Sequence, residues 1–181
     1  MESVKIGEDV FEILLPEEQI RARIKELAAR LRLDYAGKTP IFIGILNGSF
    51  IFMSDLVKEF GDVCEIDFFK LSSYGDELIS SGAVKLLKEL NCTVTGRDLI
   101  IVEDIVDTGL SIKFIEQLIA EHSPNSTRVI SLLLKPDSLK YDAKIDYIGF
   151  EIPSRYVIGY GLDYKQQYRN LRSIYVLREE V

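Results

Sequence analysis

Three carboxylates stand close together directly after the apolar run at residues 99–102: Glu103, Asp104 and Asp107. Thr108 and Gly109 then turn the chain, and apolar residues at helical spacing begin at Ile112. Backbone N–H groups at the start of such a helix bind anions, the hydroxyls of Thr108 and Ser111 can add donors, and Gly109 lets the backbone approach a ligand closely. Carboxylates repel a phosphate but suit sugar hydroxyls, a proton or Mg²⁺. The stretch therefore predicts a site for a phosphorylated sugar, with the phosphate on the loop and the hydroxyls on the acids.

Other chemistries that such a loop suggests do not match its spacing. The chain has neither the Gly-x-Gly-x-x-Gly of a dinucleotide site nor the Gly-Lys-Ser/Thr ending of a P-loop. Asp104 and Asp107 are one residue too far apart for the Asp-x-Asp-x-Thr of dehalogenase-type phosphatases, and an isoprenoid-synthase acid cluster lies on helices rather than after a strand. His122, the only histidine, stands near the predicted end of a helix, so no Ser/His or Cys/His hydrolytic arrangement is expected.

The composition favours a single globular domain. The chain has 181 residues, of which 47% are apolar and 28% charged, and its net charge of −7 argues against a surface that tracks nucleic acid. No apolar run approaches the length of a membrane span. Cys64 and Cys92 lie in or beside apolar stretches without metal-ligand spacing, which predicts buried free thiols in a reducing compartment. We therefore expect a cytoplasmic protein with no membrane partner.

Strands alternate with helices through the first two-thirds of the chain. A loosely alternating segment at residues 5–15 predicts one short strand, and Pro16 then opens a helix. The apolar stripe of this helix is formed by Ile20, Ile24, Leu27, Ala28 and Leu31. Apolar runs predict further strands at residues 41–46, 63–71, 84–90, 99–102, 128–134, 146–150 and 173–177. The alternation indicates an α/β fold with a mainly parallel, twisted sheet flanked by helices.

The carboxyl ends of these strands predict where a ligand binds. In a parallel α/β sheet, ligands lie outside the carboxyl ends of the strands. That rule brings four segments to one edge, namely residues 46–49, 72–82 and 103–111 and Lys135. The segment at 72–82 is rich in serine and glycine, which is typical of a long functional loop or hairpin.

Residues 102–109 read Val-Glu-Asp-Ile-Val-Asp-Thr-Gly, which resembles the phosphoribosyl-pyrophosphate (PRPP) loop of the type I phosphoribosyltransferases and is closest to their hypoxanthine–guanine branch. The resemblance extends from about residue 41 to residue 177, with its parts in the family's order. It implies one phosphoribosyltransferase domain over residues 1–181, with a core at about 36–150 and a small hood formed by about 1–15 and 151–181. It also implies an enzyme of purine salvage, which moves the 5-phosphoribosyl group of PRPP onto hypoxanthine or guanine, giving IMP or GMP and pyrophosphate.

The resemblance assigns roles within the acidic loop. Glu103 and Asp104 would hold the ribose hydroxyls. Asp107 would be the catalytic residue, exchanging a proton with the purine N7, and such general acid–base help is typically worth about 10² to 10⁴ in rate. The groups that would bind the 5-phosphate are Asp107, Thr108, Gly109, Leu110 and Ser111.

Pyrophosphate and Mg²⁺ are further expectations from the resemblance. Asn47 and Gly48 match the family's pyrophosphate loop, where a cis peptide bond occurs and where a lysine often stands in place of Asn47. Arg169 matches the arginine that grips pyrophosphate with its forked donors. Mg²⁺ would be held mostly by the anionic substrate. Its ligands from the chain would be Glu103, Asp104 and Asp163.

The purine site is expected from segments outside the acidic loop. Lys135 matches the lysine that donates to the exocyclic oxygen of a 6-oxopurine, and this chemistry disfavours adenine. Tyr156 matches an aromatic residue that stacks on the base, and Val157 would offer backbone groups to its edge. Asp163 lies in the same part of the chain and is expected beside the base as well as at the metal.

Loop movement and assembly are also implied by the resemblance. Ser73 and Tyr74 match the family's flexible loop, which closes over the active site and excludes water from the reacting sugar. The partners would be PRPP and a 6-oxopurine base, without nucleic acid. The chain itself would form a homodimer or a homotetramer.

Two alternatives remain open at this point. The first is a different 6-oxopurine preference, with xanthine accepted or dominant, because the sequence around Tyr156 and Leu162 cannot rank the bases. The second is a regulator of the same fold that binds PRPP or a nucleotide and controls RNA or DNA. Such a regulator generally needs a basic face, which the net charge of −7 disfavours.

Overall fold

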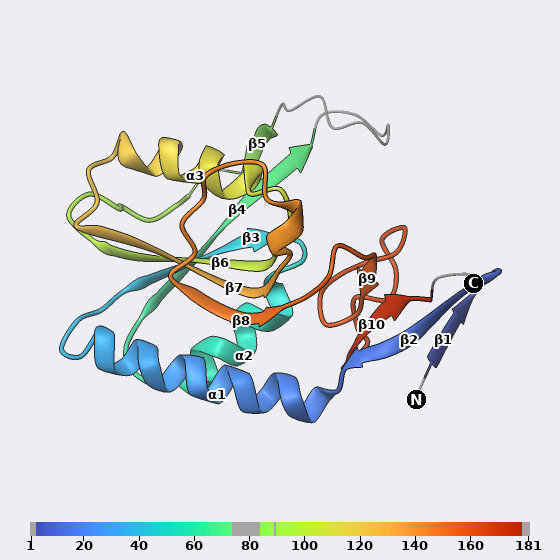
Figure 1. The fold of residues 1–181 in the computed structure, drawn as a ribbon. Coiled ribbons are helices and arrows are strands. Elements are labelled where there is room, and N and C mark those ends of the chain that lie inside the picture. The colour runs from blue at the N-terminus through green and yellow to red at the C-terminus, as the bar shows by residue number, and fades with distance from the viewer. Residues whose placement is uncertain (1–2, 74–83, 89, 179–181) are drawn as a thin grey trace.

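The computed structural model describes residues 3–73, 84–88 and 90–178, which fold into a core and a smaller hood (Figure 1). The core sheet consists of β3 Ile41–Leu46, β4 Glu65–Ser73, β5 Val84–Lys88, β6 Asp98–Val106, β7 Ser126–Leu134 and β8 Tyr147–Glu151. Their order is β5-β4-β3-β6-β7-β8. Neighbours from β4 to β8 pair in parallel, whereas β5 pairs antiparallel with β4. The predicted α/β fold with a mainly parallel sheet is confirmed.

Helices cover both faces of the core sheet. α1 (Glu17–Asp34) and α2 (Phe50–Phe60) lie on one face, and α3 (Leu110–Ala120) lies on the other (Figure 1). Because alternate residues of a strand point to opposite faces, Phe42 packs in the cluster of α1 and α2, whereas Ile41 packs in the cluster of α3. Burial on both faces explains why these strands read as near-continuous apolar runs.

The helix predicted after Pro16 is α1. Pro16 has an extended conformation, with φ −65° and ψ 152°, and Glu17 and Glu18 occupy the first turn, where the helix dipole favours acids. The whole predicted stripe is buried, namely Ile20, Ile24, Leu27, Ala28 and Leu31. α1 therefore packs on the core sheet through the face that its sequence shows.

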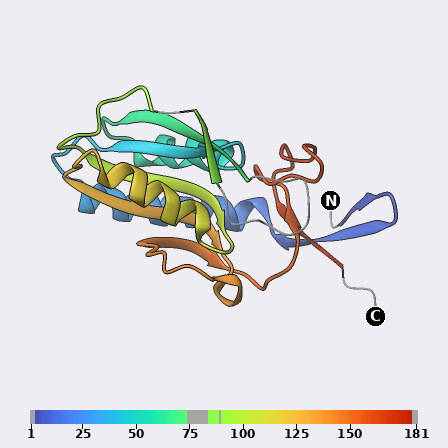
Figure 2. The ribbon, with the colours of Figure 1, turned by 90° about the horizontal axis from the view of Figure 1, so that it is seen from above.

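The hood brings together segments from both ends of the chain. Its antiparallel sheet has the order β1-β2-β10-β9, with the bounds Ser3–Ile6, Asp9–Leu15, Ile174–Leu177 and Val157–Ile158. A small core of Phe11, Ile158 and Tyr175 holds it together. Seen from above, it lies beside the core sheet (Figure 2). The residue bounds expected for core and hood stay a prediction.

The structure corrects three details of the sequence prediction. Residues 5–15 form parts of two strands rather than one, because Gly7 turns the chain between β1 and β2 with a φ of 61°. β9 is absent from the prediction, since a strand of two residues has no readable alternation. Cys64 and Cys92 are free, as expected, but half-buried rather than buried.

The carboxyl ends of β3, β6, β7 and β8 point toward the hood (Figure 1). The loops that follow β3 and β6, and Lys135 after β7, therefore face it. A 3₁₀ helix, η1 (Pro136–Ser138), follows Lys135. β4 ends at Ser73 and β5 begins at Val84, so most of the loop expected at 72–82, including Tyr74, lies outside the described residues. Across the described parts of the chain, no helix is both long and apolar enough to span a bilayer.

Asp67, on β4, is a buried carboxylate that ties the end of β5 to the core sheet. Its oxygens accept hydrogen bonds from the backbone N–H groups of Phe68 (2.8 Å), Asn91 (2.5 Å) and Cys92 (3.0 Å) and from the ammonium of Lys88 (3.0 Å). Burial alone would raise the pKa of Asp67, but these hydrogen bonds together hold it well below its ordinary value. The ionised carboxylate therefore stabilises the folded chain.

We predict that Asp67→Asn lowers the free energy of unfolding near pH 7 by about 2 kcal/mol, the typical worth of hydrogen bonds to a charged group. Because the pKa of Asp67 is lower in the folded than in the unfolded chain, this stabilisation is present above about pH 4 and is lost as the pH falls through the folded-state pKa. Urea unfolding near pH 7 and near pH 3 measures the effect. The difference in the free energy of unfolding between the variant and the unaltered chain should be smaller at the lower pH.

Glu65→Gln is the matched control for this experiment. Glu65 lies on the same strand and forms a partly exposed ion pair with Arg97 at 2.6 Å, so its loss should cost less than about 1 kcal/mol. An equal loss of stability for Asp67→Asn at both pH values would contradict the role given to the ionised carboxylate.

Candidate active site

The loop between β6 and α3 has the form that the sequence predicted. Gly109 turns the chain into α3 with a φ of 84°, and a Cβ at this position would lie 3.2 Å from the carbonyl oxygen of Tyr141. The carbonyl oxygen of Thr108 accepts hydrogen bonds from the backbone N–H groups of Lys140 (3.0 Å) and Tyr141 (3.1 Å). The segment after η1 therefore supports the loop from outside.

A hollow of about 100 Å³ lies at this loop, lined by residues 103 and 105–112. Leu110 and Ser111 begin α3 there, where the N–H groups of the first helical turn have no partner within the helix. The hollow is much smaller than the roughly 300–1,000 Å³ of a ligand pocket for a drug-sized molecule. Its size and its donors suit a compact anion such as a phosphate.

Glu103 and Asp104 are nearly buried near the end of β6, with 7% and 8% of their surface exposed. Burial raises the pKa of both carboxyl groups, and the charge of Asp104 raises that of Glu103 further. The backbone N–H of Ile105 donates to Asp104 Oδ1 at 3.0 Å. Two adjacent buried acids favour a ligand that supplies hydroxyl donors or a cation.

The loop after β3 lies directly against Asp104. Its peptide bond between Leu46 and Asn47 is cis, as the resemblance implies. Gly48 comes so close to the acid that a Cβ there would lie 1.6 Å from Asp104 Oδ2. Ser49 is fully buried, and its hydroxyl donates to a carbonyl oxygen of β3 at 2.7 Å. Only a glycine at position 48 lets this loop and the acid occupy the same corner.

Arg169 reaches this corner from the hood. Its guanidinium donates to the carbonyl oxygen of Gly161 at 2.8 Å and pairs with the carboxylate of Asp163 at 2.8 Å. Its charge also lowers the pKa of Asp104, against the larger effect of burial. A Cβ on Gly161 would lie 2.0 Å from the carbonyl oxygen of Gly48. The hood thus places a forked cation, suited to phosphate oxygens, beside the loop after β3.

Lys135 and Asp107 form an ion pair, with 2.8 Å between Nζ and Oδ2. The backbone N–H of Lys135 donates to the carbonyl oxygen of Val106 at 3.0 Å, which fixes the two segments beside each other. The Asp107 side chain is 49% exposed and that of Lys135 only 11%. The pair offers an ammonium donor and a carboxylate acceptor side by side, as neighbouring polar atoms on one edge of a planar ligand require.

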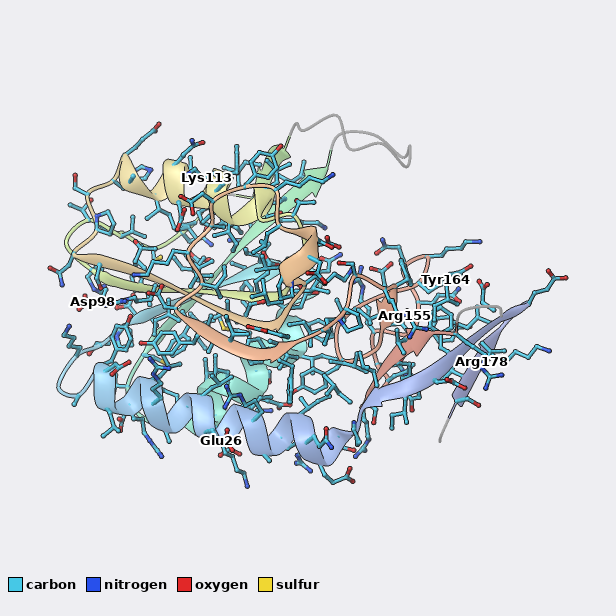
Figure 3. The ribbon with its side chains drawn as sticks, viewed as in Figure 1. Glu26, Asp98, Lys113, Arg155, Tyr164 and Arg178 are labelled. Atoms are coloured by element: carbon cyan, nitrogen blue, oxygen red, sulfur yellow. The ribbon has the colours of Figure 1, made fainter. Side chains whose placement is uncertain are left out.

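Tyr156 presents a half-exposed ring in the hood. Its hydroxyl donates to the carbonyl oxygen of Asp163 at 2.9 Å. Edge-to-face contacts hold the ring against Phe11 and Tyr164, with centroid distances of 6.3 Å and 6.1 Å, and Figure 3 shows Tyr164 in this region. Val157 is buried next to it in β9. These contacts therefore fix the position of the Tyr156 ring, while part of the ring stays exposed to a ligand.

The predicted flexible loop lies largely outside the described residues. Ser73 is the last residue of β4, and Tyr74 lies outside the described residues, so their role stays a prediction. Gly161, which contacts Gly48 and Arg169, is absent from the sequence prediction, as is its neighbour Tyr160. The signal for them is local, because Gly159 and Gly161 flank Tyr160, and closely spaced glycines mark a turn.

The oxygen donors of the site fit Mg²⁺ shared with a substrate. Across residues 3–73, 84–88 and 90–178, no group of three or more Asp, Glu, His or Cys side chains could hold a metal ion by itself. Mg²⁺ is commonly bound by one or two carboxylates together with substrate phosphates and water. Burial raises the pKa of Glu103 and Asp104, which disfavours their ionised forms, and a bound cation would favour ionisation again.

Comparisons with known proteins agree with this geometry. Residues 11–165 match the model of the phosphoribosyl transferase domain family. The hypoxanthine-guanine phosphoribosyltransferase of Bacillus subtilis is 43% identical over 173 residues, which are 96% of this chain and 96% of that protein. A hypoxanthine phosphoribosyltransferase structure from Staphylococcus aureus has a TM-score of 0.88 and 43% identity, over 92% of this chain and 91% of that chain. A Trypanosoma cruzi hypoxanthine phosphoribosyl transferase, studied for the role of its C-terminal region in oligomeric state and activity, has a TM-score of 0.87 and 39% identity, over 97% and 95%.

We predict that Gly48→Ala weakens PRPP binding about 10²-fold, because the added Cβ would overlap the Asp104 carboxylate and displace either the loop or the acid. Isothermal titration calorimetry measures the Kd, and circular dichroism checks that the variant folds. Gly96→Ala is the control, since no atom lies within 4 Å of its Cβ position and its φ of 69° strains only a remote turn. A folded Gly48→Ala chain with unchanged Kd would refute the close contact.

Proposed function

The chain belongs to the phosphoribosyltransferase family, in its hypoxanthine-guanine branch, and from this premise we propose the reaction of its site. It transfers the 5-phosphoribosyl group of PRPP to a ring nitrogen of hypoxanthine or guanine. The products are IMP or GMP and pyrophosphate. The reaction is a step of purine salvage.

The ion pair of Lys135 and Asp107 is the observation that carries this proposal. A 6-oxopurine presents an oxygen acceptor at C6 next to the ring nitrogen N7. The Lys135 ammonium donates to the oxygen, and the Asp107 carboxylate accepts the proton of N7, so that the two groups at 2.8 Å address neighbouring atoms. Adenine carries an amino donor at C6, which would face another donor. The pair therefore selects a 6-oxopurine.

Asp107 acts as the general acid or base near N7. Its half-exposed carboxylate can take up or return the proton as the glycosidic bond forms or breaks. The ring of Tyr156 stacks on the base, with its hydroxyl held by the carbonyl oxygen of Asp163. Val157, next to Tyr156 in the chain, offers backbone groups to the edge of the purine.

The acidic loop binds the sugar phosphate. Backbone N–H groups of residues 107–111 and the hydroxyls of Thr108 and Ser111 hold the 5-phosphate in the hollow at the start of α3. Glu103 and Asp104 accept hydrogen bonds from the ribose hydroxyls. Their carboxylates also lie near the ring carbon on which positive charge develops in the transition state, and they stabilise that charge.

Pyrophosphate is bound between the loop after β3 and the hood. Arg169 grips it with two parallel donors, while Asn47 and Gly48 offer backbone N–H groups. Mg²⁺, when bound, neutralises part of the charge of the diphosphate leaving group. The residues of the chain that would hold it are Glu103, Asp104 and Asp163.

Assembly and location complete the proposal. The chain forms a homodimer or a homotetramer. The oligomeric state of the Trypanosoma cruzi relative has been studied in connection with its C-terminal region. It acts in the cytoplasm on small molecules rather than on nucleic acid, in keeping with its net charge of −7. Size-exclusion chromatography with light scattering distinguishes the two assemblies.

Turnover measured with each purine base in turn tests the proposed reaction. We expect spectrophotometric turnover with PRPP and Mg²⁺ for hypoxanthine and guanine, and none for adenine. Dominant turnover of xanthine would replace the proposed preference with another 6-oxopurine. Absence of turnover with every base, together with tight RNA binding, would overturn the assignment as an enzyme.

We predict that Asp107→Asn lowers kcat at least about tenfold while PRPP binding largely survives, because the amide cannot accept the N7 proton. Steady-state kinetics with hypoxanthine and calorimetry with PRPP separate the two effects. Asp137→Asn is the control, since Asp137 is an exposed acid on the neighbouring η1 and lies outside the proposed machinery. An unchanged kcat would show that Asp107 only shapes the loop.

A further inference from the structure

Residues 159–162 of the hood form a tight turn with an unusual central residue. Gly159 and Leu162 pair across it through backbone hydrogen bonds of 3.0 Å and 3.1 Å. Tyr160 and Gly161, the two central residues, have φ values of 51° and 104°. Turns with positive φ at both central positions strongly prefer asparagine, aspartate or glycine, and a bulky residue rarely adopts this conformation. The backbone of the turn therefore does not explain why position 160 is a tyrosine.

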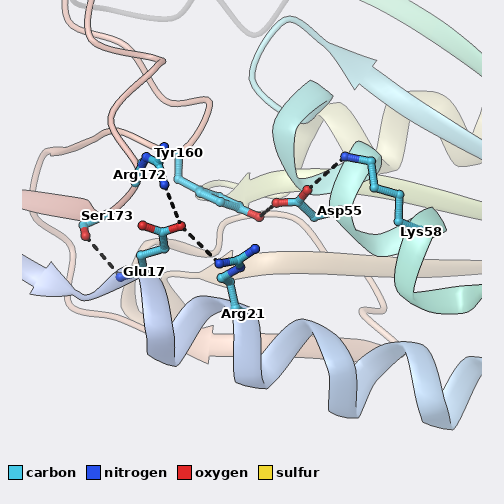
Figure 4. A network of polar contacts seen from close by, with 7 residues as sticks. All are labelled: Glu17, Arg21, Asp55, Lys58, Tyr160, Arg172 and Ser173. Atoms are coloured by element: carbon cyan, nitrogen blue, oxygen red, sulfur yellow. Dashed lines mark hydrogen bonds and ion pairs between the residues drawn. The ribbon is translucent and has the colours of Figure 1, made fainter.

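The side chain of Tyr160 connects the turn to α2. Its ring is only 4% exposed, and its hydroxyl donates to Asp55 Oδ2 at 2.6 Å, as Figure 4 shows. Burial and the bond to Asp55 raise the pKa of Tyr160, so the hydroxyl keeps its proton at neutral pH. The second carboxylate oxygen of Asp55 lies 3.5 Å from Lys58 on the same helix. The hydrogen bond therefore joins the hood to the helix that begins directly after Ser49.

The turn also contacts the proposed pyrophosphate site through its backbone. Gly161 lies against the carbonyl oxygen of Gly48, leaving no room for a Cβ. Its own carbonyl oxygen accepts a hydrogen bond from the Arg169 guanidinium at 2.8 Å, and its N–H donates to the Arg169 carbonyl oxygen at 2.9 Å. A shift of the turn relative to α2 would therefore move Arg169 relative to Gly48.

A second anchor fixes the other side of the turn. A Cβ on Gly159 would lie 2.2 Å from the carbonyl oxygen of Ser173. The Ser173 hydroxyl in turn accepts a hydrogen bond from the backbone N–H of Glu17, at the start of α1, at 3.1 Å (Figure 4). The Glu17 carboxylate pairs with the highly exposed Arg172 at 3.4 Å. The turn is thus held between α1 and α2, and Tyr160 supplies the side-chain bond to α2.

We propose that Tyr160 and Asp55 are positioning residues for pyrophosphate recognition: their hydrogen bond holds the turn against α2 and so sets Arg169 opposite Gly48. This inference rests on the proposed function, because it takes the site of Arg169 and Gly48 as the one that binds the diphosphate of PRPP. Neither residue touches the substrate. The ion pair of Lys135 and Asp107, which would address the purine, comes from the segments after β7 and β6 rather than from this turn.

The test is PRPP affinity, measured by calorimetry with Mg²⁺, alongside steady-state kinetics with hypoxanthine. Tyr160→Phe keeps the ring and removes only the hydroxyl, and Asp55→Ala removes its acceptor. Both should raise the Kd for PRPP about tenfold and leave the KM for hypoxanthine within about twofold, since a hydrogen bond to a charged group is lost. Asp55→Asn keeps an oxygen acceptor and should restore most of the affinity.

Two further variants, namely Arg172→Ala and a double variant of Tyr160 and Asp55, sharpen the test. Arg172 belongs to the same polar network but is bonded to Glu17 and not to the turn, so its loss should leave the Kd unchanged. The Tyr160→Phe, Asp55→Ala double variant should bind PRPP no more weakly than either single variant, because both remove one bond. A merely structural role would instead lower the thermal midpoint and the active fraction, and it would not change the Kd for PRPP more than the KM for hypoxanthine.

An unchanged Kd for PRPP in both folded single variants would overturn the positioning role. Equal weakening of PRPP and hypoxanthine would overturn it as well, because it would indicate a general loosening of the fold. Failure of the proposed function has a different signature, since the unaltered chain would then show no turnover of hypoxanthine or guanine with PRPP.

Discussion

The lack of space around Gly48 is the constraint on which the catalytic end of this protein depends. The Asp104 carboxylate occupies the position that a Cβ would need, and the turn at Gly161 lies on the Gly48 carbonyl oxygen. Three segments that are far apart in the chain are thereby in direct contact. Each contributes a different group, namely a backbone loop, a buried acid and, through Arg169, a forked cation. Close approach of backbones thus brings these three groups together at the place where we propose that the diphosphate of the substrate binds.

Electrostatics at this corner favour a ligand over an empty site. Glu103 and Asp104 are buried side by side, and burial raises the pKa of both, so their charge is costly without a partner. Arg169 offsets part of that cost for Asp104. Sugar hydroxyls and a cation shared with a diphosphate would offset the remainder. Placing unfavourable charge where a substrate compensates it is a common exchange of stability for function.

The core and the hood contribute different residues to the proposed site. The parallel sheet is buried on both faces, so the ends of β3, β6 and β7 rigidly support the loop with Asn47 and Gly48, the acids and Lys135, respectively. The hood adds Arg169 and Tyr156, which the sheet alone could not supply. Side-chain bonds such as that between Tyr160 and Asp55 connect the two parts. The geometry of catalysis therefore depends on how the hood sits on the core as well as on the core itself.

The sequence by itself determined the local features of this protein. Apolar runs identified the core strands, the stripe from Ile20 to Leu31 identified the buried face of α1, and the acids of residues 103–107 with Gly109 identified the loop between β6 and α3. These features depend on residues within one or two turns or one strand, and the physical rules that read them act over the same range. The resemblance of one loop then supplied the predictions for most other site residues.

Only the tertiary structure decided how the distant segments meet. It divided residues 5–15 at Gly7, brought Lys135 within 2.8 Å of Asp107, and set Gly161 on Gly48. It also gave Tyr160 a partner on α2 that no pattern near either residue indicates. Such contacts depend on how whole elements pack, because a side chain's partner across the fold is set by the relative position of two backbones and not by its neighbours in sequence.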